Sequence, residues 1–182
     1  QVAVGGGDDP HVDGDFLLQD GPYSYLQPQG LPGLFTNITI EGNGSTIRRD
    51  PLDPDEFAIA IVVYNDATIN DVTISGGTGE YGGGVLAYHA DTVTISGSTI
   101  SGNYAEGFGG GIFAFNSDIL ISGTTISGNE SDFFGGGAAL AGGTFAIVNS
   151  TISGNSANYA VGGLSLGVIP SPFPSEGAII NS

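Results

Sequence analysis

Acidic side chains near the N-terminus are the first residues whose types and spacing suggest chemistry. Four aspartates surround Gly14 in a short stretch, and they are Asp8, Asp9, Asp13 and Asp15. Carboxylate oxygens on a flexible glycine loop suit Ca²⁺, which takes about six to eight oxygen ligands. We therefore predict a Ca²⁺ site at these aspartates, with a solvated acidic loop as the alternative.

A second acidic cluster follows Arg48 and Arg49. Its carboxylates are Asp50, Asp53, Asp55 and Glu56. The arginines compete with a metal ion for these carboxylates, so a solvated loop is again the alternative. His11 and His89 are single and far apart in the sequence, which disfavours a zinc site.

Carboxylates in the second half of the chain raise the question of glycoside hydrolysis, which uses two acids. Glu106 and Asp132 are separated by 26 residues, which is also the repeat length of the chain. Asp91 and Asp118 share another turn position, where aspartate is common for backbone reasons. There is no lysine, and both arginines lie in one early loop. We predict that the protein is not an enzyme.

A fixed sequence period shows how the chain must position these residues. The tetrapeptide Thr-Ile-Ser-Gly begins at Thr73, Thr99, Thr125 and Thr151, always 26 residues after the previous copy. Self-similarity at such a period is typical of a solenoid, in which each repeat is one coil stacked on its neighbour. Residues separated by 26 positions should therefore lie side by side.

Each repeat contains three short runs of alternating apolar and polar residues, separated by Gly, Asn, Ser and Asp turns. This pattern predicts an all-β solenoid, a parallel β-helix with about 26 residues and three short strands per coil. Ile74, Ile100, Ile126 and Ile152 should point inward, with the flanking Thr and Ser outward. An asparagine column should form a turn with left-handed backbone and an amide ladder. Its members are Asn103, Asn129 and Asn155.

The repeats resemble a known group of proteins. Ser-Thr-Ile-Ser-Gly-Asn and the glycine triplets, such as 109–111 before Ile112, are similar to those of secreted repeat proteins in the right-handed parallel β-helix (pectate-lyase-like) superfamily. Phe113-Ala114-Phe115-Asn116 also resembles repeats of polymorphic outer-membrane proteins and autotransporter passengers. The resemblance covers about residues 35–182 and implies the fold. It leaves function open, because the superfamily contains lyases, hydrolases, adhesins, fibres and ice binders.

Composition narrows the function classes. The 182 residues carry a net charge of −17 with no cysteine, methionine or tryptophan, which argues against nucleic acid or an anionic membrane as partner. No apolar run approaches the ~20 residues of a membrane span. We expect one domain, with an N-terminal strand and acidic cap at 1–34 and repeats at 35–182. We also expect a secreted protein at the cell surface.

The end of the last repeat suggests self-assembly. Asn149-Ser150 is followed by another Thr-Ile-Ser-Gly copy, whereas Asn181-Ser182 is not. We predict that Gln1-Val2-Ala3-Val4 of one subunit completes the last coil of a neighbour, giving a head-to-tail filament. That interface contains Gln1, Val2, Ala3, Val4, Ala178, Ile179, Ile180, Asn181 and Ser182. The alternative is that the chain is a fragment of a longer solenoid.

The strands after the glycine triplets are apolar on both faces, which predicts an outward apolar patch. Its members are Leu86, Tyr88, Phe113 and Phe115. Either residues 16–34 cover this patch or a second subunit contacts it laterally.

Three further functions stay open beside the filament. The chain is an adhesin-type β-helix that binds a glycan or a host surface, an ice-binding protein, or a polysaccharide-degrading enzyme. Ice binding would use two outward hydroxyl ranks, one of threonines and one of serines. Their members are Thr73, Thr99, Thr125 and Thr151, and Ser75, Ser101, Ser127 and Ser153.

Overall fold

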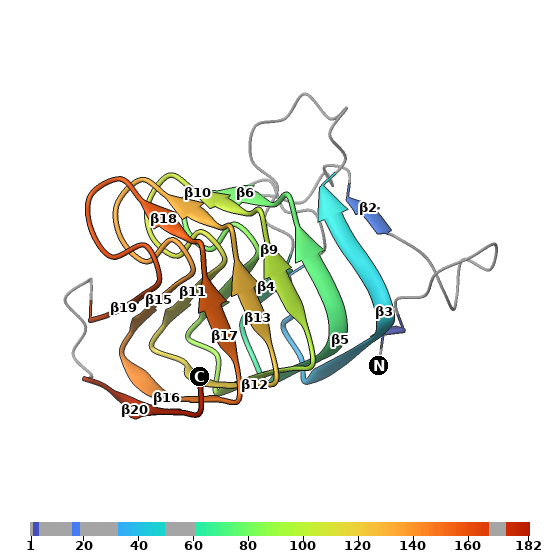
Figure 1. The fold of residues 1–182 in the computed structure, drawn as a ribbon. Helices are drawn as coiled ribbons and strands as arrows, with labels where there is room; N and C mark the ends of the chain where they lie inside the picture. Colours follow the sequence, from blue (N-terminus) through green and yellow to red (C-terminus); the bar gives the residue numbers. More distant parts are fainter. Residues whose placement is uncertain (1, 4–15, 19–32, 50–60, 168–173) are drawn as a thin grey trace.

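A computed structural model gives the fold (Figure 1). It describes residues 2–3, 16–18, 33–49, 61–167 and 174–182. In these ranges the chain forms only β-strands and turns. The strands are β1 (Val2–Ala3), β2 (Phe16–Leu18), β3 (Ile38–Arg49), β4 (Ile61–Val63), β5 (Ala67–Ser75), β6 (Thr78–Gly79), β7 (Val85–Tyr88), β8 (Thr92–Ser96), β9 (Thr99–Ser101), β10 (Tyr104–Ala105), β11 (Ile112–Phe115), β12 (Asp118–Ser122), β13 (Thr125–Ser127), β14 (Glu130–Ser131), β15 (Ala138–Ala141), β16 (Gly143–Val148), β17 (Thr151–Ser153), β18 (Ser156–Ala157), β19 (Leu164–Leu166) and β20 (Ser175–Ile180).

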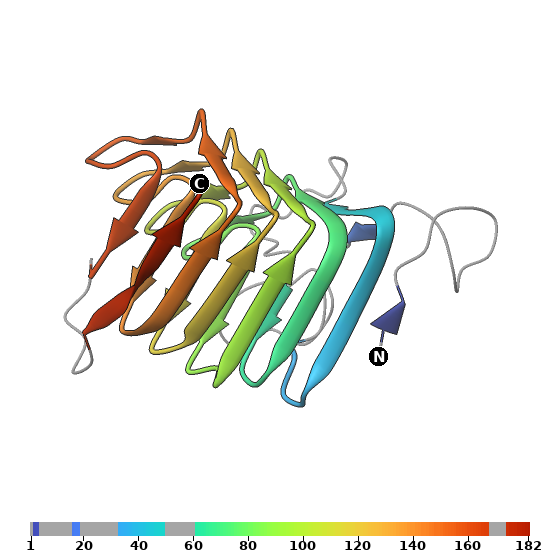
Figure 2. The same cartoon turned by 60° about the horizontal axis from the view of Figure 1, so that its bottom comes forward.

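The strands stack into three parallel sheets that run the length of a solenoid. The largest holds β17, β13, β9, β5, β8, β12, β16 and β20 in order, with β1, β2 and β3 joined through β3. A second sheet contains β18, β14, β10 and β6, and a third contains β19, β15, β11, β7 and β4. Figure 2 shows the strands of successive coils side by side. The predicted fold class, an all-β parallel solenoid, is confirmed.

The register confirms the period read from the sequence. Thr125 pairs with Thr99 on one side and Thr151 on the other, so neighbouring coils are 26 residues apart. The last step is longer, because Ile147 pairs with Ile179. The three predicted strands per coil are present. A fourth strand of only two residues, such as β10, follows each Thr-Ile-Ser strand and is too short to show alternation in the sequence.

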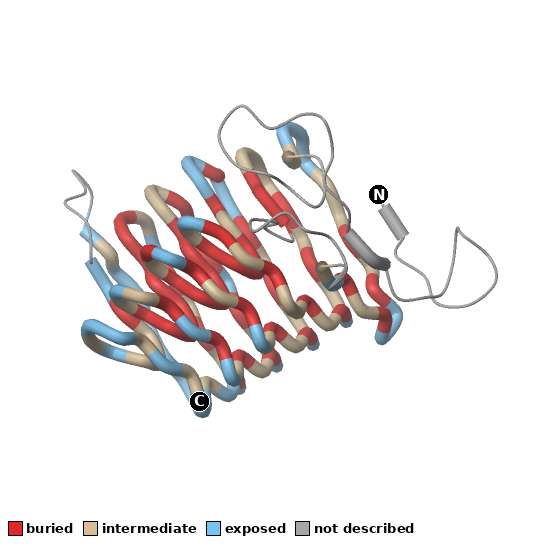
Figure 3. The backbone as a smooth tube through the Cα atoms, turned by 90° about the horizontal axis from the view of Figure 1, so that it is seen from above, coloured by how far each residue is buried: buried red, intermediate tan, exposed pale blue. Residues whose placement is uncertain are grey.

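Two inward isoleucine columns form most of the core. One contains Ile40, Ile69, Ile95, Ile121 and Ile147, and the other contains Ile47, Ile74, Ile100 and Ile126, all essentially inaccessible to solvent. Figure 3 shows these buried positions alternating with partly exposed ones along each coil. Full burial of such a side chain contributes about 1.5–3 kcal/mol. Ile152 extends the second column but is only partly buried, because no described coil covers it.

The turn at the asparagine column differs from the prediction. The left-handed residue is the preceding glycine, with φ of 63° at Gly102 and 62° at Gly128, and none of the three column asparagines has positive φ. Glycine takes this conformation without steric cost. The asparagine side chain is thereby free to point inward and bond to neighbouring coils.

The glycine triplets mark places where coils come into direct backbone contact. A Cβ added to Gly110 would overlap the carbonyl oxygen of Glu130, and one added to Gly136 would overlap that of Ser156. Only glycine permits this approach. The prediction that these triplets lie at crowded corners is confirmed.

The N-terminal strands stack on the chain's own first full coil. β1 pairs in parallel with β3 through Val2 and Ile40, and β2 pairs with the same strand through Phe16 and Ile47. These strands therefore continue the two sheet columns that contain β20 and β17 at the other end.

Candidate functional site

The C-terminal end of the solenoid is the first candidate site. Strands β17, β18, β19 and β20 are the last members of their sheets, and no described strand pairs with their outer edges. Figure 1 shows this end in orange and red beside the C-terminus. Ile179 lies in a core column yet is 53% exposed, whereas its partner Ile147 is fully buried. Such an edge presents unpaired backbone groups and apolar surface to another strand.

The structure places the two halves of the predicted interface at opposite ends of the solenoid. Ala178 and Ile180 pair with β16, and Asn181 adopts a left-handed turn with φ of 51°. Val2 and Ala3 pair within the chain on β3, in the column of β20. The sequence comparison had aligned them with the Thr-Ile-Ser-Gly column instead, so that register is wrong. Gln1 and Val4 lie outside the described residues.

The asparagine ladder is confirmed in detail. The Asn129 Oδ1 accepts the backbone N–H of Asn103 at 3.0 Å and its Nδ2–H at 2.9 Å. The Asn129 Nδ2 donates to the Ile100 carbonyl at 2.9 Å and to the Asn155 Oδ1 at 3.0 Å. Asn103 and Asn129 are buried, so these bonds satisfy groups that water does not reach.

A second ladder, of hydroxyl groups, was missed by the sequence reasoning. The Thr124 Oγ1 accepts the N–H of Ser98 at 3.4 Å, and the Ser150 Oγ accepts that of Thr124 at 3.2 Å. The Ser182 Oγ then accepts the N–H of Ser150 at 3.1 Å. The signal was a Ser or Thr directly before each Thr-Ile-Ser strand, which resembles an ordinary polar turn.

Both ladders have the same polarity. In every step, a side-chain oxygen of the following coil accepts a backbone N–H of the preceding coil, beginning at Gly77 and Val72. At the last coil this pattern stops. The Asn155 Nδ2 still donates to the Ile126 carbonyl at 2.9 Å, but no described residue accepts the Asn155 backbone N–H.

The predicted lateral patch is largely internal. Phe113 is only 3% exposed, because Tyr81 and Phe108 from the preceding loops pack against it. Leu86 and Phe115 are partly buried beside it, and Tyr88 alone is well exposed. The loops between the short strands and the third sheet therefore cover this face, which local alternation did not reveal. Cover by residues 16–34 is not tested, because residues 19–32 lie outside the described ranges.

Aromatic rings form a strip along one corner. Phe35 stacks on Tyr64 with centroids 4.7 Å apart, and Tyr88 stacks on Phe115 at 5.5 Å. His89 packs edge-on against both Tyr88 and Phe115. These pairs occupy ring faces that a sugar would otherwise stack on. The strip thus serves coil packing better than glycan recognition.

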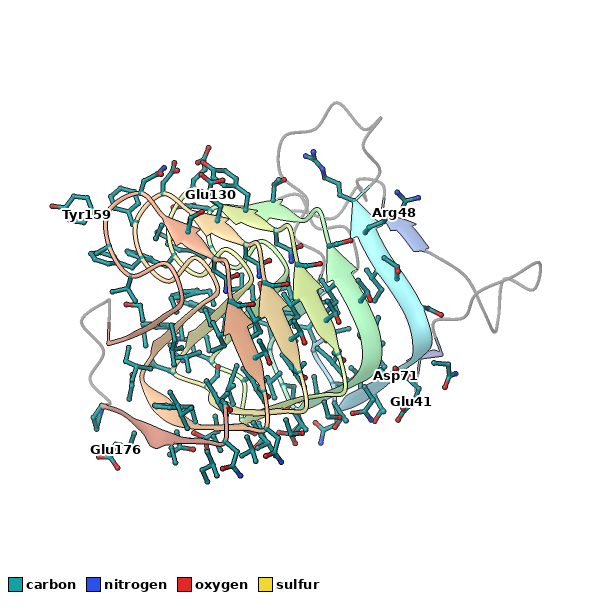
Figure 4. The ribbon with its side chains drawn as sticks, in the orientation of Figure 1. Glu41, Arg48, Asp71, Glu130, Tyr159 and Glu176 are labelled. Carbon is teal, nitrogen blue, oxygen red and sulfur yellow. The ribbon has the colours of Figure 1, made fainter. Side chains whose placement is uncertain are left out.

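The carboxylates of the repeat region bond to neighbouring coils. Asp132 accepts the Tyr104 hydroxyl at 2.8 Å and the Asn158 amide at 2.8 Å. Burial, followed by this hydrogen bond, raises the pKa of Tyr104 to about 12. Asp118 accepts the Thr144 N–H at 2.7 Å, while Asp91 and Glu106 are exposed. Figure 4 shows Glu130 and Glu41 on opposite sides of the solenoid, so the acids do not converge on one point.

The proposed metal ligands Asp8, Asp9, Asp13 and Asp15 lie outside the described residues, as do Asp50, Asp53, Asp55 and Glu56. Within the part of the chain that the structure describes, no three His, Asp or Glu residues are grouped to hold a metal ion. The Ca²⁺ site therefore stays a prediction.

The hydroxyl ranks occupy one outward column each. Thr46, Thr73, Thr99, Thr125 and Thr151 align through successive pairs, and the Ser75 column begins with Arg48. The inner members are half-buried and the last coil's Thr151 and Ser153 are exposed. The ranks are thus regular, as predicted.

Comparison with known proteins supports the fold. In the described ranges no helix has the length and hydropathy needed to span a bilayer. Searches of curated proteins and of solved structures found no match. The family described as "Right handed beta helix region" matches residues 33–167. This fold is shared by pectate-lyase-like enzymes and by proteins without enzyme activity. With most of its length matched, the chain belongs to the right-handed β-helix family.

Proposed function

We propose that this chain is an extracellular structural subunit whose solenoids stack head to tail into a surface filament or sheath. The observation that carries the proposal is the uncovered C-terminal coil, where Ile152 and Ile179 continue core columns but lack a covering coil. Isoleucine in these columns is fully buried elsewhere. A further coil would bury them and pair the open strand edges.

The two ends of the solenoid are compatible in strand direction and column. β1 lies in the column of β20, and β2 lies in the column of β17, with all pairs parallel. Stacking one subunit on the next would place β20 against β1 and β17 against β2. This contact replaces the predicted strand exchange. It is heterologous, so repetition gives an open filament with a rise of about 30 Å, or roughly six coils at ~4.8 Å.

Charge favours end-to-end over side-by-side contact. A net charge of −17 with only two basic residues makes the side faces of neighbouring subunits repel each other. The C-terminal edge instead carries apolar Ile179 and Ile180. Because salt screens repulsion between exposed charges, assembly should strengthen as ionic strength rises.

The test is sedimentation velocity with electron microscopy on the purified chain over a range of concentrations. Ile179→Lys places a charge on the open edge, whereas Leu120→Lys adds the same charge to the side face, in the middle of the same sheet. We expect concentration-dependent filaments for the parent chain and Leu120→Lys, and monomers for Ile179→Lys. A parent chain that stays monomeric at high concentration in both low and high salt refutes the filament.

The adhesin alternative has less support, because the stacked rings of the corner strip have their faces occupied. No second function is therefore proposed.

A further inference from the structure

The edge of β17 has a chemical polarity that goes beyond its being unpaired. Thr151 donates its N–H to the Thr124 carbonyl, and Ser153 accepts the N–H of Gly128, so both residues face the preceding coil. Backbone groups alternate in direction along a parallel strand. The N–H and C=O of Ile152 therefore face the open side.

The two ends of this edge are defined by the ladders. At one end, Ser182 already occupies the hydroxyl position of the next step, since its Oγ accepts the Ser150 N–H. At the other end, Asn155 presents a backbone N–H with no described acceptor. The edge is thus a slot of five residues, 151–155, with an apolar centre at Ile152 and a donor at its far end.

Each preceding step shows what fills such a slot. On β13, the occupant is Thr151-Ile152-Ser153-Gly154-Asn155. Its isoleucine stacks on Ile126, Gly154 has φ of 62°, and the Asn155 Oδ1 accepts the N–H and Nδ2–H of Asn129. Its Nδ2 also donates to the Ile126 carbonyl. One asparagine thus makes three hydrogen bonds to the coil before it.

We infer that the β17 slot is a strand-capture site specific for an extended segment X-Ile-X-Gly-Asn, presented in parallel by another polypeptide. The central residue must be apolar, to cover Ile152. The fourth must be glycine, because its backbone is left-handed. The fifth must bring a side-chain oxygen, because the slot offers donors there. The site belongs to the same open end as the proposed function, on which it rests only in using that end, since the partner need not be a second copy.

The chain's own N-terminus does not meet these requirements. In Gln1-Val2-Ala3-Val4-Gly5, a valine stands at the left-handed position and a glycine at the asparagine position. Left-handed backbone is strongly disfavoured for a β-branched residue. Glycine also has no side chain to accept the Asn155 donors.

The test titrates synthetic peptides into the ¹⁵N-labelled chain and follows amide shifts of Ile152 and Asn155. The probe is Ser-Thr-Ile-Ser-Gly-Asn-Glu-Ser. The matched controls replace its Asn by Ala or its Gly by Val, and a third peptide carries residues 1–7. We expect shifts confined to β17 and its neighbours, with affinity at least about tenfold weaker for the Ala peptide, which loses buried hydrogen bonds. The Val and 1–7 peptides should bind no better than the Ala peptide.

The inference is overturned if the probe causes no shifts at millimolar concentration, or if all four peptides bind alike. A protein variant adds an independent readout. Asn155→Asp keeps the oxygen that accepts from Asn129 but sets a carboxylate against the incoming oxygen, so probe affinity should fall while the circular dichroism spectrum is kept. Filament formation is scored separately. Peptide binding without filaments would refute the proposed function alone, and filaments without peptide selectivity would refute the slot alone.

Discussion

Replacing Asn129 by alanine tests whether the asparagine ladder stabilises the solenoid. The side chain makes four hydrogen bonds, to the backbone N–H and Nδ2 of Asn103, the Ile100 carbonyl and the Asn155 Oδ1. It is fully buried. After the substitution, the Asn103 N–H and the Ile100 carbonyl would lose these partners in the interior.

The expected cost follows from these contacts. Each hydrogen bond contributes about 1 kcal/mol net, and a buried group left unpaired costs about 1–3 kcal/mol. We expect Asn129→Ala to lower the free energy of unfolding by about 3–5 kcal/mol. Asn155→Ala removes three bonds at a half-exposed position, where water can replace them, so about 1–2 kcal/mol is expected.

Urea unfolding followed by far-ultraviolet circular dichroism measures both losses, since the chain has no tryptophan. Asn158→Ala is the control, because this exposed asparagine makes one bond, to Asp132. It should cost no more than about 0.5 kcal/mol. The reasoning fails if Asn129→Ala costs under about 1 kcal/mol, or no more than Asn158→Ala.

Three further predictions concern single positions. Gly110→Ala should cost more than about 3 kcal/mol because its Cβ overlaps a backbone carbonyl, whereas Gly128→Ala, with open space around it, should cost only the ~1 kcal/mol of a left-handed alanine. Equal melting temperatures for the two would contradict this. Ser131→Ala should be neutral or raise stability by about 1 kcal/mol, because the buried Ser131 hydroxyl lacks a partner and Ala105 occupies the equivalent position in the preceding coil; a marked loss on thermal melting would show a hidden partner. Tyr104 should ionise with a pKa of about 12, above its ordinary 10.0, so the stability it contributes is complete below pH ~10 and is lost as pH rises toward 12. Absorbance at alkaline pH, compared between the parent chain and Tyr104→Phe, measures this ionisation, and a Tyr104 that titrates near 10 in the folded chain would refute it.

Much of the fold could be predicted because a repeated sequence repeats its physics. The 26-residue spacing of Thr-Ile-Ser-Gly places identical residues side by side, so Ile74, Ile100 and Ile126 had to stack in the core. The alternation around each isoleucine set which residues face inward. The asparagine amide ladder followed from the same spacing, because a buried column of amides must bond along its own axis.

The remaining features depend on contacts that local patterns do not contain. Phe113 alternates outward and reads as exposed, yet Tyr81 and Phe108 return from neighbouring loops to bury it. Val2 resembles the centre of a Thr-Ile-Ser strand, but pairs with Ile40 in the other column.

The sequence by itself determined the coil length, the core columns and the glycine corners, because these depend only on period and residue type. The tertiary structure alone decided the polarity of the two ladders and the side of the coil on which donors remain open. Hydrogen-bond direction at Asn155 depends on which coil lies on which side, and this is set by how the whole chain winds.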